Sequence, residues 1–128
     1  MIEINGWITI CVTADGEEDT SELNIVVQKI EKIITPLMIL NQIFEIKALN
    51  GVYTLFIGLN HNHDNNYSNS VYRLLCEIGD IAIGSYGLVY IRNHEVDFNR
   101  FKVLRLSKGN VTFEEDKLLS PCNPVIED

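Results

Sequence analysis

The feature that most constrains the fold is a turn signal between two apolar segments in the middle of the chain. Residues 42–49 and 52–59 are rich in β-branched, aliphatic and aromatic side chains, and only Asn50-Gly51 separates them. Asn-Gly favours a two-residue turn in which both residues have a positive φ, and the twist of such a turn matches that of antiparallel strands. The sequence therefore predicts a β-hairpin over residues 42–59.

Two other segments have the periodicity of amphipathic helices. Over residues 20–37 the apolar side chains recur every three or four positions, as they do along the buried stripe of a helix. Asp19 and Glu22 have the spacing of a capping box at the start of this segment. A second stripe with the same spacing starts near Ser68 or Asn69, so we predict one helix on each side of the hairpin.

Four more segments have the composition of strands. They cover residues 2–12, with a bend at Gly6, and residues 85–92, 101–106 and 111–113. The order of elements is then β-α-β-β-α-β followed by a C-terminal β-hairpin. This order predicts an α+β domain with a ferredoxin-like βαββαβ antiparallel sheet and two helices on one face. The other face must be exposed to water, covered by the tail, or used for binding.

The last dozen residues, 117–128, are unusually apolar for a chain terminus. Pro121 and Pro124 fix φ and suit an extended coil. Leu118, Leu119, Val125 and Ile126 would serve no purpose in a polar, unpacked tail. We therefore expect an ordered tail that packs back onto the domain.

Four segments carry a resemblance to a known family. They are Gly6-Trp7-Ile8, residues 59–63 (LNHNH), residues 84–92 (GSYGLVYIR) and residues 119–128 (LSPCNPVIED), in this order along the chain. With these motifs the chain resembles the immunity protein 7 family of bacterial polymorphic toxin systems. The resemblance implies a small antitoxin that binds a cognate toxin domain and blocks it, and it implies no catalytic activity.

Length and composition indicate one globular domain over residues 1–128. Apolar residues make up 46% and charged residues 22%, which is an ordinary balance for a water-soluble protein. No apolar run approaches the roughly 20 residues that span a bilayer, and residues 1–4 (MIEI) lack the basic start of a secretory signal. We expect a cytoplasmic monomer or homodimer that makes no membrane contact.

The net charge of −8 constrains the kind of partner. This sign opposes direct binding to nucleic-acid phosphates and favours a basic partner, such as a nuclease toxin domain. One short segment holds five candidates for toxin contact, namely Asp15, Glu17, Glu18, Asp19 and Glu22. The alternative is a solvated surface that keeps the protein soluble, and part of the cluster also suits the positive end of a helix.

The polar loop after the predicted hairpin contains His61, His63 and Asp64. Two histidines at i and i+2 on a strand share a face and suit zinc, but the site needs a third protein ligand, from His94 or an unplaced carboxylate. The alternatives are histidines that hydrogen-bond within the fold and histidines that contact the toxin. We take these three residues as toxin-binding candidates and expect no metal and no cofactor.

The three cysteines do not indicate a disulfide or a metal site. Their odd number and wide spacing, at Cys11, Cys76 and Cys122, fit neither a disulfide framework nor a zinc motif. Cys11 and Cys76 lie in apolar patterns and are expected in the core. Cys122 lies between prolines, where it is either buried or exposed.

Other motif residues have structural interpretations. Trp7 is expected in the core with its indole N–H paired, and the alternative is an exposed aromatic anchor at an interface. Gly84 is interpreted as a helix stop and Gly87 as part of a strand start that needs close backbone approach. A phosphate-binding loop would precede a helix, whereas this segment precedes a strand. Tyr86 and Tyr90 share one side of that strand, either as core residues or as an interface stripe.

The residues contain no nucleophile–base pair, so we predict no enzyme and no catalytic residue. The preferred interpretation is an antitoxin that occludes the active site of its toxin, or a neighbouring exosite, in a stoichiometric complex. The predicted contact surface combines residues 15–22 with the loop 60–66. One alternative is a metal-dependent or small-molecule-binding enzyme or regulatory domain that would use His61 and His63, and another is a homodimer that pairs through the open sheet face.

Overall fold

The computed structural model describes residues 1–15, 19–97 and 99–122, and it consists of a six-stranded antiparallel sheet with two α-helices. The predicted α+β class is therefore confirmed. The helices are α1 (Thr20–Ile34), which continues into the short 3-10 helix η1 (Thr35–Leu37), and α2 (Tyr67–Ile81). The strands are β1 (Ile2–Thr9), β2 (Gln42–Leu49), β3 (Val52–His61), β4 (Tyr86–Asn93), β5 (Lys102–Ser107) and β6 (Asn110–Glu115).

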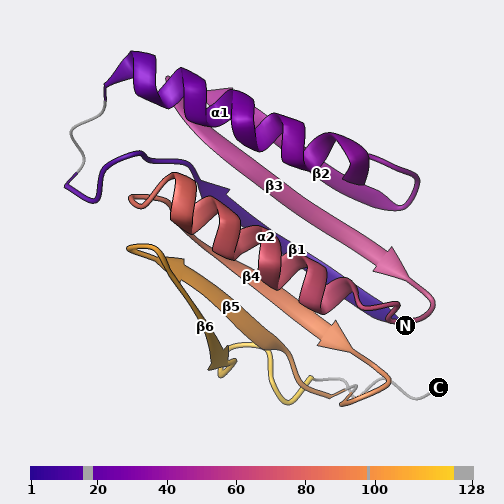
Figure 1. Cartoon of the computed structure of the whole chain (residues 1–128). Helices are drawn as coiled ribbons and strands as arrows, with labels where there is room; N and C mark the ends of the chain where they lie inside the picture. Colours follow the sequence, from indigo (N-terminus) through magenta and orange to yellow (C-terminus); the bar gives the residue numbers. More distant parts are fainter. Residues whose placement is uncertain (16–18, 98, 123–128) are drawn as a thin grey trace.

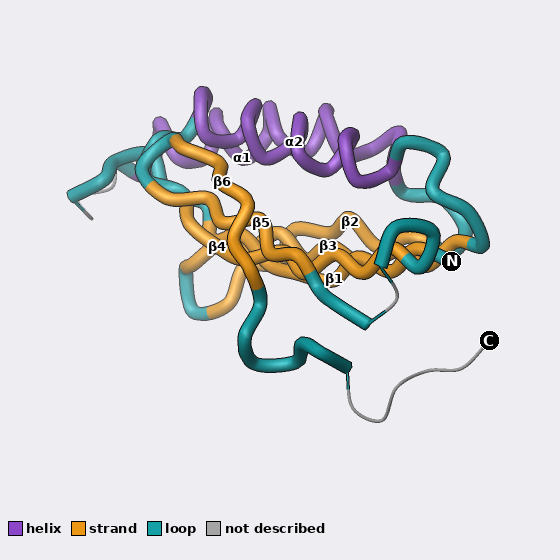
Figure 2. The backbone as a smooth tube through the Cα atoms, turned by 90° about the horizontal axis from the view of Figure 1, so that it is seen from below, coloured by secondary structure: helices purple, strands orange, loops and turns teal. Residues whose placement is uncertain are grey.

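The first strand in the sequence lies in the interior of the sheet. The strand order is β2-β3-β1-β4-β5-β6, and each strand is antiparallel to its neighbours. Both helices lie over the same face of the sheet (Figures 1 and 2). Within the described part of the chain, the opposite face carries no helix, and we call it the open sheet face.

The predicted central hairpin is confirmed. Asn50 and Gly51 have φ values of 53° and 77°, the positive values that a type I′ turn requires. The pairing of β2 with β3 runs from Leu49 opposite Val52 to Gln42 opposite Leu59. The turn thus sets the register of the edge strand β2 and decides which of its side chains face the helices.

Alternate residues of the strands form the core beneath the helices. In β1, Ile2, Ile4 and Ile8 are fully buried, because successive strand residues point to opposite faces and these three share the helix-covered one. The buried stripes of the two helices follow the predicted spacing. They consist of Val26, Val27, Ile30 and Ile34 in α1, and of Val71, Leu74, Leu75, Ile78 and Gly79 in α2.

The first helix has Asp19 as its N-terminal cap, which is one half of the predicted capping box, and it ends earlier than predicted. The side chain of Asp19 accepts hydrogen bonds from the backbone N–H of Ser21 and of Glu22, at 2.8 and 3.4 Å. The α-helix stops at Ile34 instead of residue 37, and the last three predicted residues form η1. Pro36 explains the change, because it has no N–H to donate to the preceding turn.

Gly84 does not stop the second helix, and this prediction is wrong. The helix α2 begins at Tyr67, slightly before the predicted start, and its last residue is Ile81. A Cβ atom at Gly84 would instead overlap the backbone of Thr13. Gly84 is therefore required where the chain after β1 passes close to the turn between α2 and β4.

The described part of the tail packs against the loop between β4 and β5. Ser120 Oγ accepts a hydrogen bond from the backbone N–H of Phe101 at 2.7 Å, and the N–H of Cys122 donates to the carbonyl of Asn99 at 2.6 Å. Cys122 is buried, whereas Pro121 is exposed. Leu118 and Leu119 are exposed too, so the expectation that these two leucines pack against the domain is wrong. Residues 123–128 lie outside the described residues, so the packing of the end of the tail stays a prediction.

The expected core positions of Cys11 and Cys76 are wrong. Cys11 and Cys76 are half-buried and do not belong to the fully buried core, and all three cysteines have free thiols. The backbone N–H of Cys11 donates to Ser85 Oγ at 3.1 Å. Cys11 lies just beyond β1, where the chain leaves the sheet, and this position explains its partial exposure.

Close approach between β1 and β4 gives a stability prediction. A Cβ atom at Gly87 would overlap the carbonyl of Trp7 and the Cα of Ile8, whereas a Cβ at Gly58 would meet atoms only at 3.7 Å or more. We therefore expect Gly87→Ala to lower the free energy of unfolding by about 1–3 kcal/mol. We expect Gly58→Ala to change it by no more than about 1 kcal/mol, with either sign. Urea denaturation of both variants measures the difference, and equal effects would contradict this account of the β1–β4 contact.

Candidate functional site

The open sheet face carries an apolar patch at its centre. The cross-strand pairing places Phe56 of β3, Trp7 of β1 and Leu88 of β4 side by side. In the neighbouring row, Ile43 of β2 lies opposite Gly58, and Asn5 of β1 lies opposite Tyr90. Large exposed apolar areas rimmed by polar residues mark interaction sites. We call the group Trp7, Ile43, Phe56, Leu88 and Tyr90 the apolar patch.

Trp7 lies in this patch and not in the core, so the expectation of a core position is wrong. Its side chain is 40% exposed and contacts Tyr86 edge-to-face, with ring centroids 6.1 Å apart. The reason is strand alternation, because Ile4 and Ile8 occupy the helix-covered positions of β1 and the odd-numbered residues point the other way. The structure thus agrees with the alternative interpretation, an exposed aromatic side chain.

A hollow of about 440 Å³ opens in the middle of the apolar patch. Its walls include Trp7, Phe56 and Tyr90, and its floor lies at Asn5 and Gly58. Gly58 has no side chain, and Asn5 Oδ1 would be 3.7 Å from a Cβ at that position, so the amide of Asn5 reaches over the glycine. Aromatic walls around a small polar floor are typical of a pocket that receives one side chain of a partner.

Two ion pairs lie on the open sheet face, and Arg105 of β5 is exposed on the same face opposite Leu88. Glu3 Oε1 lies 3.6 Å from Arg92 Nη1, and Glu45 Oε1 lies 3.0 Å from Lys47 Nζ. Arg92 is buried, with its guanidinium 5.6 Å from the ring centre of Phe101. The hollow therefore has no charged side chain in its lining, while two carboxylates, those of Glu3 and Glu45, lie in neighbouring positions of the sheet.

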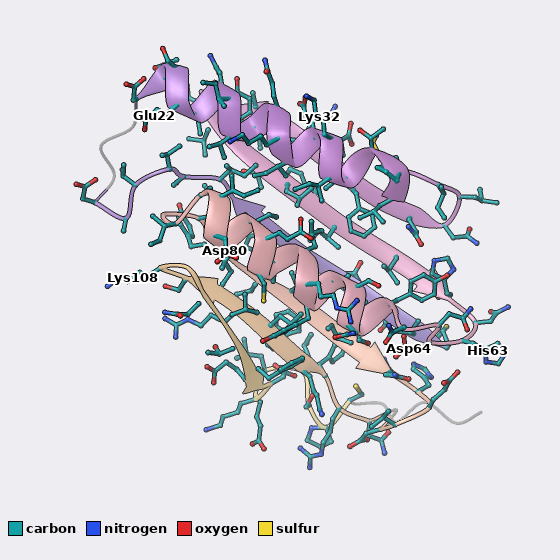
Figure 3. All side chains as sticks on the ribbon, in the orientation of Figure 1. Glu22, Lys32, His63, Asp64, Asp80 and Lys108 are labelled. Carbon is teal, nitrogen blue, oxygen red and sulfur yellow. The ribbon has the colours of Figure 1, made fainter. Side chains whose placement is uncertain are left out.

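The described residues of the acidic segment that was predicted as a contact lie at one end of the sheet, around the start of α1 (Figure 3). Asp15 and Glu22 are exposed, and Asp19 is exposed but is used as the helix cap. Glu17 and Glu18 lie outside the described residues. The structure thus gives Asp19 a structural role and leaves the other acidic residues of the segment as proposed contacts.

The loop with His61, His63 and Asp64 lies at the other end of the sheet, as Figure 3 shows by the positions of Glu22 and of His63 with Asp64. In the pairing of β1 with β3, Ile2 is opposite His61 and Thr9 is opposite Thr54. Seven residue steps of about 3.3 Å place these two ends roughly 23 Å apart. The predicted contact residues therefore form two groups, at opposite ends of the sheet (Figure 3).

The two histidines of the loop have different environments. His61 Nε2 hydrogen-bonds Gln42 Oε1 at 2.8 Å, and its ring stacks on Tyr67 with centroids 4.2 Å apart. His63 is exposed, and its Nδ1 lies 3.0 Å from Glu95 Oε1. This hydrogen bond from His63, together with the one from the backbone N–H of Asp64, lowers the pKa of Glu95 below its ordinary value. His61 thus joins β3, β2 and α2, while His63 stays accessible.

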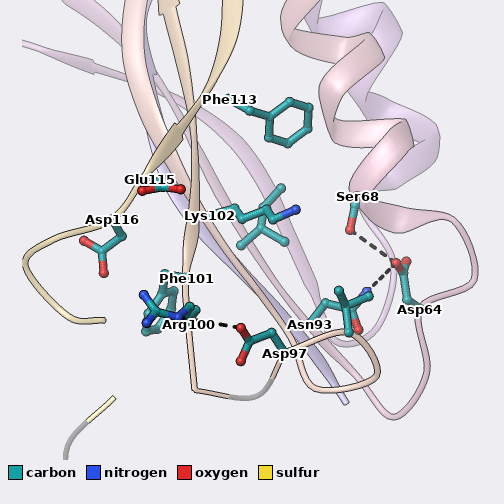
Figure 4. Close-up of a pocket in the computed structure, with 12 residues that line it drawn as sticks. Asp64, Ser68, Asn93, Asp97, Arg100, Phe101, Lys102, Phe113, Glu115 and Asp116 are labelled. Carbon is teal, nitrogen blue, oxygen red and sulfur yellow. Dashed lines mark hydrogen bonds and ion pairs between the residues drawn. The ribbon is translucent and has the colours of Figure 1, made fainter. Parts of the chain in front are cut away.

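Asp64 is held between three neighbours next to a second hollow, of about 450 Å³ (Figure 4). Its carboxylate accepts hydrogen bonds from the N–H of Tyr67 at 2.8 Å, from Ser68 Oγ at 3.3 Å and from Asn93 Nδ2 at 2.8 Å. These bonds fix the start of α2 against the end of β4. Arg100 and Lys102 also line the hollow beside Asp64, so its lining carries charges of both signs.

Asp116 lines the same hollow and organises the turn into the tail. Its carboxylate accepts hydrogen bonds from the N–H of Leu118 and of Leu119, at 3.0 and 2.9 Å. Burial by itself would raise the pKa of Asp116, but the hydrogen bonds from residues 118–120 outweigh burial and lower it. Asp116 is therefore ionised at neutral pH and, like Asp19, has a structural role.

Among residues 1–15, 19–97 and 99–122, no three His, Cys, Asp or Glu side chains gather in a group that could hold a metal ion. In the same ranges, no helix is both long and apolar enough to cross a bilayer.

Sequence reasoning missed Phe56, Ile43 and Asn5 as candidate contacts. The relevant signal is the alternation within residues 42–49 and 52–59, where Phe56 and Ile43 fall out of phase with the buried Leu55, Ile57 and Phe44. Alternation alone shows two faces, and the positions of both helices were needed to show which face is covered.

A comparison with known families supplies the identity that the geometry leaves open. The model of the family described as Immunity protein 7 matches residues 1–128, which is the whole chain. Comparisons with curated proteins and with solved structures give no match.

The different environments of the two histidines give a testable contrast. We expect His61→Ala to lower the free energy of unfolding by about 1 kcal/mol or more, because it removes a hydrogen bond and a stacked ring. We expect His63→Ala to change it by less than about 0.5 kcal/mol, because the exposed ion pair with Glu95 is weak in water. Thermal or urea unfolding at pH 7 measures both values. Equal losses in the two variants would mean that the contacts of His61 are not structural.

Proposed function

Because the chain belongs to the Immunity protein 7 family, we propose that it is the antitoxin of a bacterial polymorphic toxin system. It binds a cognate toxin domain in a stoichiometric complex and thereby occludes the toxin's active site or a neighbouring exosite. The match of the family model over the full length of the chain is the observation that carries this proposal. In this role the protein acts in the cytoplasm and needs no catalytic residue and no cofactor.

The surface of the molecule supports a role in protein binding. The apolar patch exposes Trp7 and Phe56 by 40% and 36%, and Ile43 by 56%. Aromatic side chains of this kind often supply most of the binding energy at an interface. The order β2-β3-β1-β4 of the first four strands also supports our assignment of a ferredoxin-like sheet, to which β5 and β6 add a hairpin.

The acidic balance supports a basic partner, and the two predicted groups of contacts keep a place in the proposal. We assign residues 15–22 and the loop 60–66 to the border of the interface, where charge steers the approach of a basic toxin domain. His63 is the accessible histidine of this loop, whereas His61 supports it from within. A net charge of −8 raises the rate of encounter with a cationic domain at low ionic strength.

Co-expression tests the proposed function directly. We expect the C-terminal domain of the protein encoded immediately upstream of this gene to arrest bacterial growth, and this chain to restore growth when expressed with it. The purified pair should elute as a single 1:1 complex in size-exclusion chromatography, since occlusion requires a stable complex. The proposal is overturned if growth stays arrested in the presence of the chain, if the two proteins elute separately, or if the domain is harmless by itself.

Charge reversal tests the role of the acidic segment. We expect Glu17→Lys with Glu18→Lys to slow association with the toxin domain several-fold at low salt, because charges at the border of an interface act mainly on the association rate. The matched control, Glu31→Lys with Glu77→Lys, makes the same charge change at exposed positions of α1 and α2. Stopped-flow association at two salt concentrations measures both rates. Equal slowing by both pairs would show that only net charge matters and would remove residues 15–22 from the interface.

A further inference from the structure

We propose that the hollow in the open sheet face receives a basic side chain of the toxin domain, best fitted by arginine. This inference rests on the proposed function and specifies the surface and the partner chemistry that it requires.

The hollow is a permanent feature of the sheet. It exists because Gly58 of β3, which has no side chain, is paired with Ile43 of β2 on one side and with Asn5 of β1 on the other. The larger side chains of Phe56 and Trp7 in the next row form one wall, and Tyr90 forms another. All of these residues belong to strands, so no loop among residues 1–15, 19–97 and 99–122 has to move to open the hollow, and binding there costs little conformational entropy.

The walls and the floor suit a guanidinium group. Three of the lining residues are aromatic, and a cation over an aromatic face is stabilised by the negative charge of the ring surface. The side chain of Asn5 makes no hydrogen bond to the described residues, so its carbonyl oxygen is free to accept one from a partner's N–H. Arginine combines an apolar stem, a flat group that stacks on aromatic rings and several N–H donors.

The net charge of the chain, −8, also favours a cationic occupant over an anionic one. No charged side chain lines the hollow, and the carboxylates of Glu3 and Glu45 lie in the adjacent rows. Two cations on this face, Arg92 and Lys47, are paired with these carboxylates, and a third, Arg105 of β5, is exposed opposite Leu88 at the edge of the apolar patch. A second copy of the chain is a poorer occupant, because each copy carries a net charge of −8 and self-association would bring like charges together.

Two substitutions at the floor test the proposal, with the toxin domain from the co-expression experiment as the probe. Gly58→Val adds a side chain that suits a strand and fills the hollow, and we expect it to weaken binding at least tenfold. Gly58→Ala fills less of the hollow and should weaken binding less. Asn5→Asp places a negative charge beside the bound basic side chain, and we expect it to tighten binding of the toxin domain several-fold at low salt and less at high salt. The control Ile25→Ala shortens an apolar side chain of α1 that is about as exposed as Ile43 but lies on the helix side of the sheet. It should leave the affinity for the toxin domain unchanged.

The outcomes separate this inference from the proposed function. If the unmodified chain binds no toxin domain, the proposed function fails. If the unmodified chain binds, and the Gly58→Val variant binds equally well while its melting temperature shows that it is folded, the toxin does not use the hollow. If Gly58→Val weakens binding but Asn5→Asp weakens it too, the bound side chain is not cationic and the arginine assignment is wrong. If sedimentation shows a dimer that Gly58→Val dissociates, the hollow accepts a second copy of this chain instead.

Discussion

The alternation of side chains along β1 is the constraint on which the rest of the structure depends. β1 lies between β3 and β4, so both of its edges are paired and its register fixes theirs. Ile2, Ile4 and Ile8 are buried beneath the helices, and the residues between them must point to the open sheet face. A shift of one residue would expose these isoleucines and bury Trp7 and Asn5. The core and the apolar patch are thus two results of a single register.

Local signals in the sequence predicted most elements of the fold, because each depends on residues close together in the chain. The Asn50-Gly51 turn needs only the backbone preferences of two residues, and the cap at Asp19 needs only the next turn of helix. The ends of α1 and α2 were less predictable. Pro36 leaves the choice between an α-helix and a 3-10 helix open, and the role of Gly84 depends on Thr13, which lies far away in sequence.

The candidate site was less predictable for a related reason. Residues 7–12 form an almost continuous apolar run, so the sequence does not show which face Trp7 takes. His61 and His63 have the spacing of a shared strand face, but β3 ends at His61 and His63 lies beyond it. The exposed acidic residues were recognised, although their distribution over opposite ends of the sheet follows only from the strand order. A site formed by several strands requires the whole topology before its members can be identified.

The division of charge between the open sheet face and the sheet ends suggests two separate contributions to binding. Exposed carboxylates at the ends act over about a Debye length and affect the rate of encounter, and salt screens them. The hollow acts only at contact, where aromatic walls and the amide of Asn5 exclude water from a bound side chain. If both proposals hold, changes at residues 15–22 affect association while changes at Gly58 affect dissociation, because most affinity differences within one interface arise in the dissociation rate. The same sheet would then separate the speed of toxin capture from the lifetime of the complex, and the lifetime decides whether the toxin stays blocked.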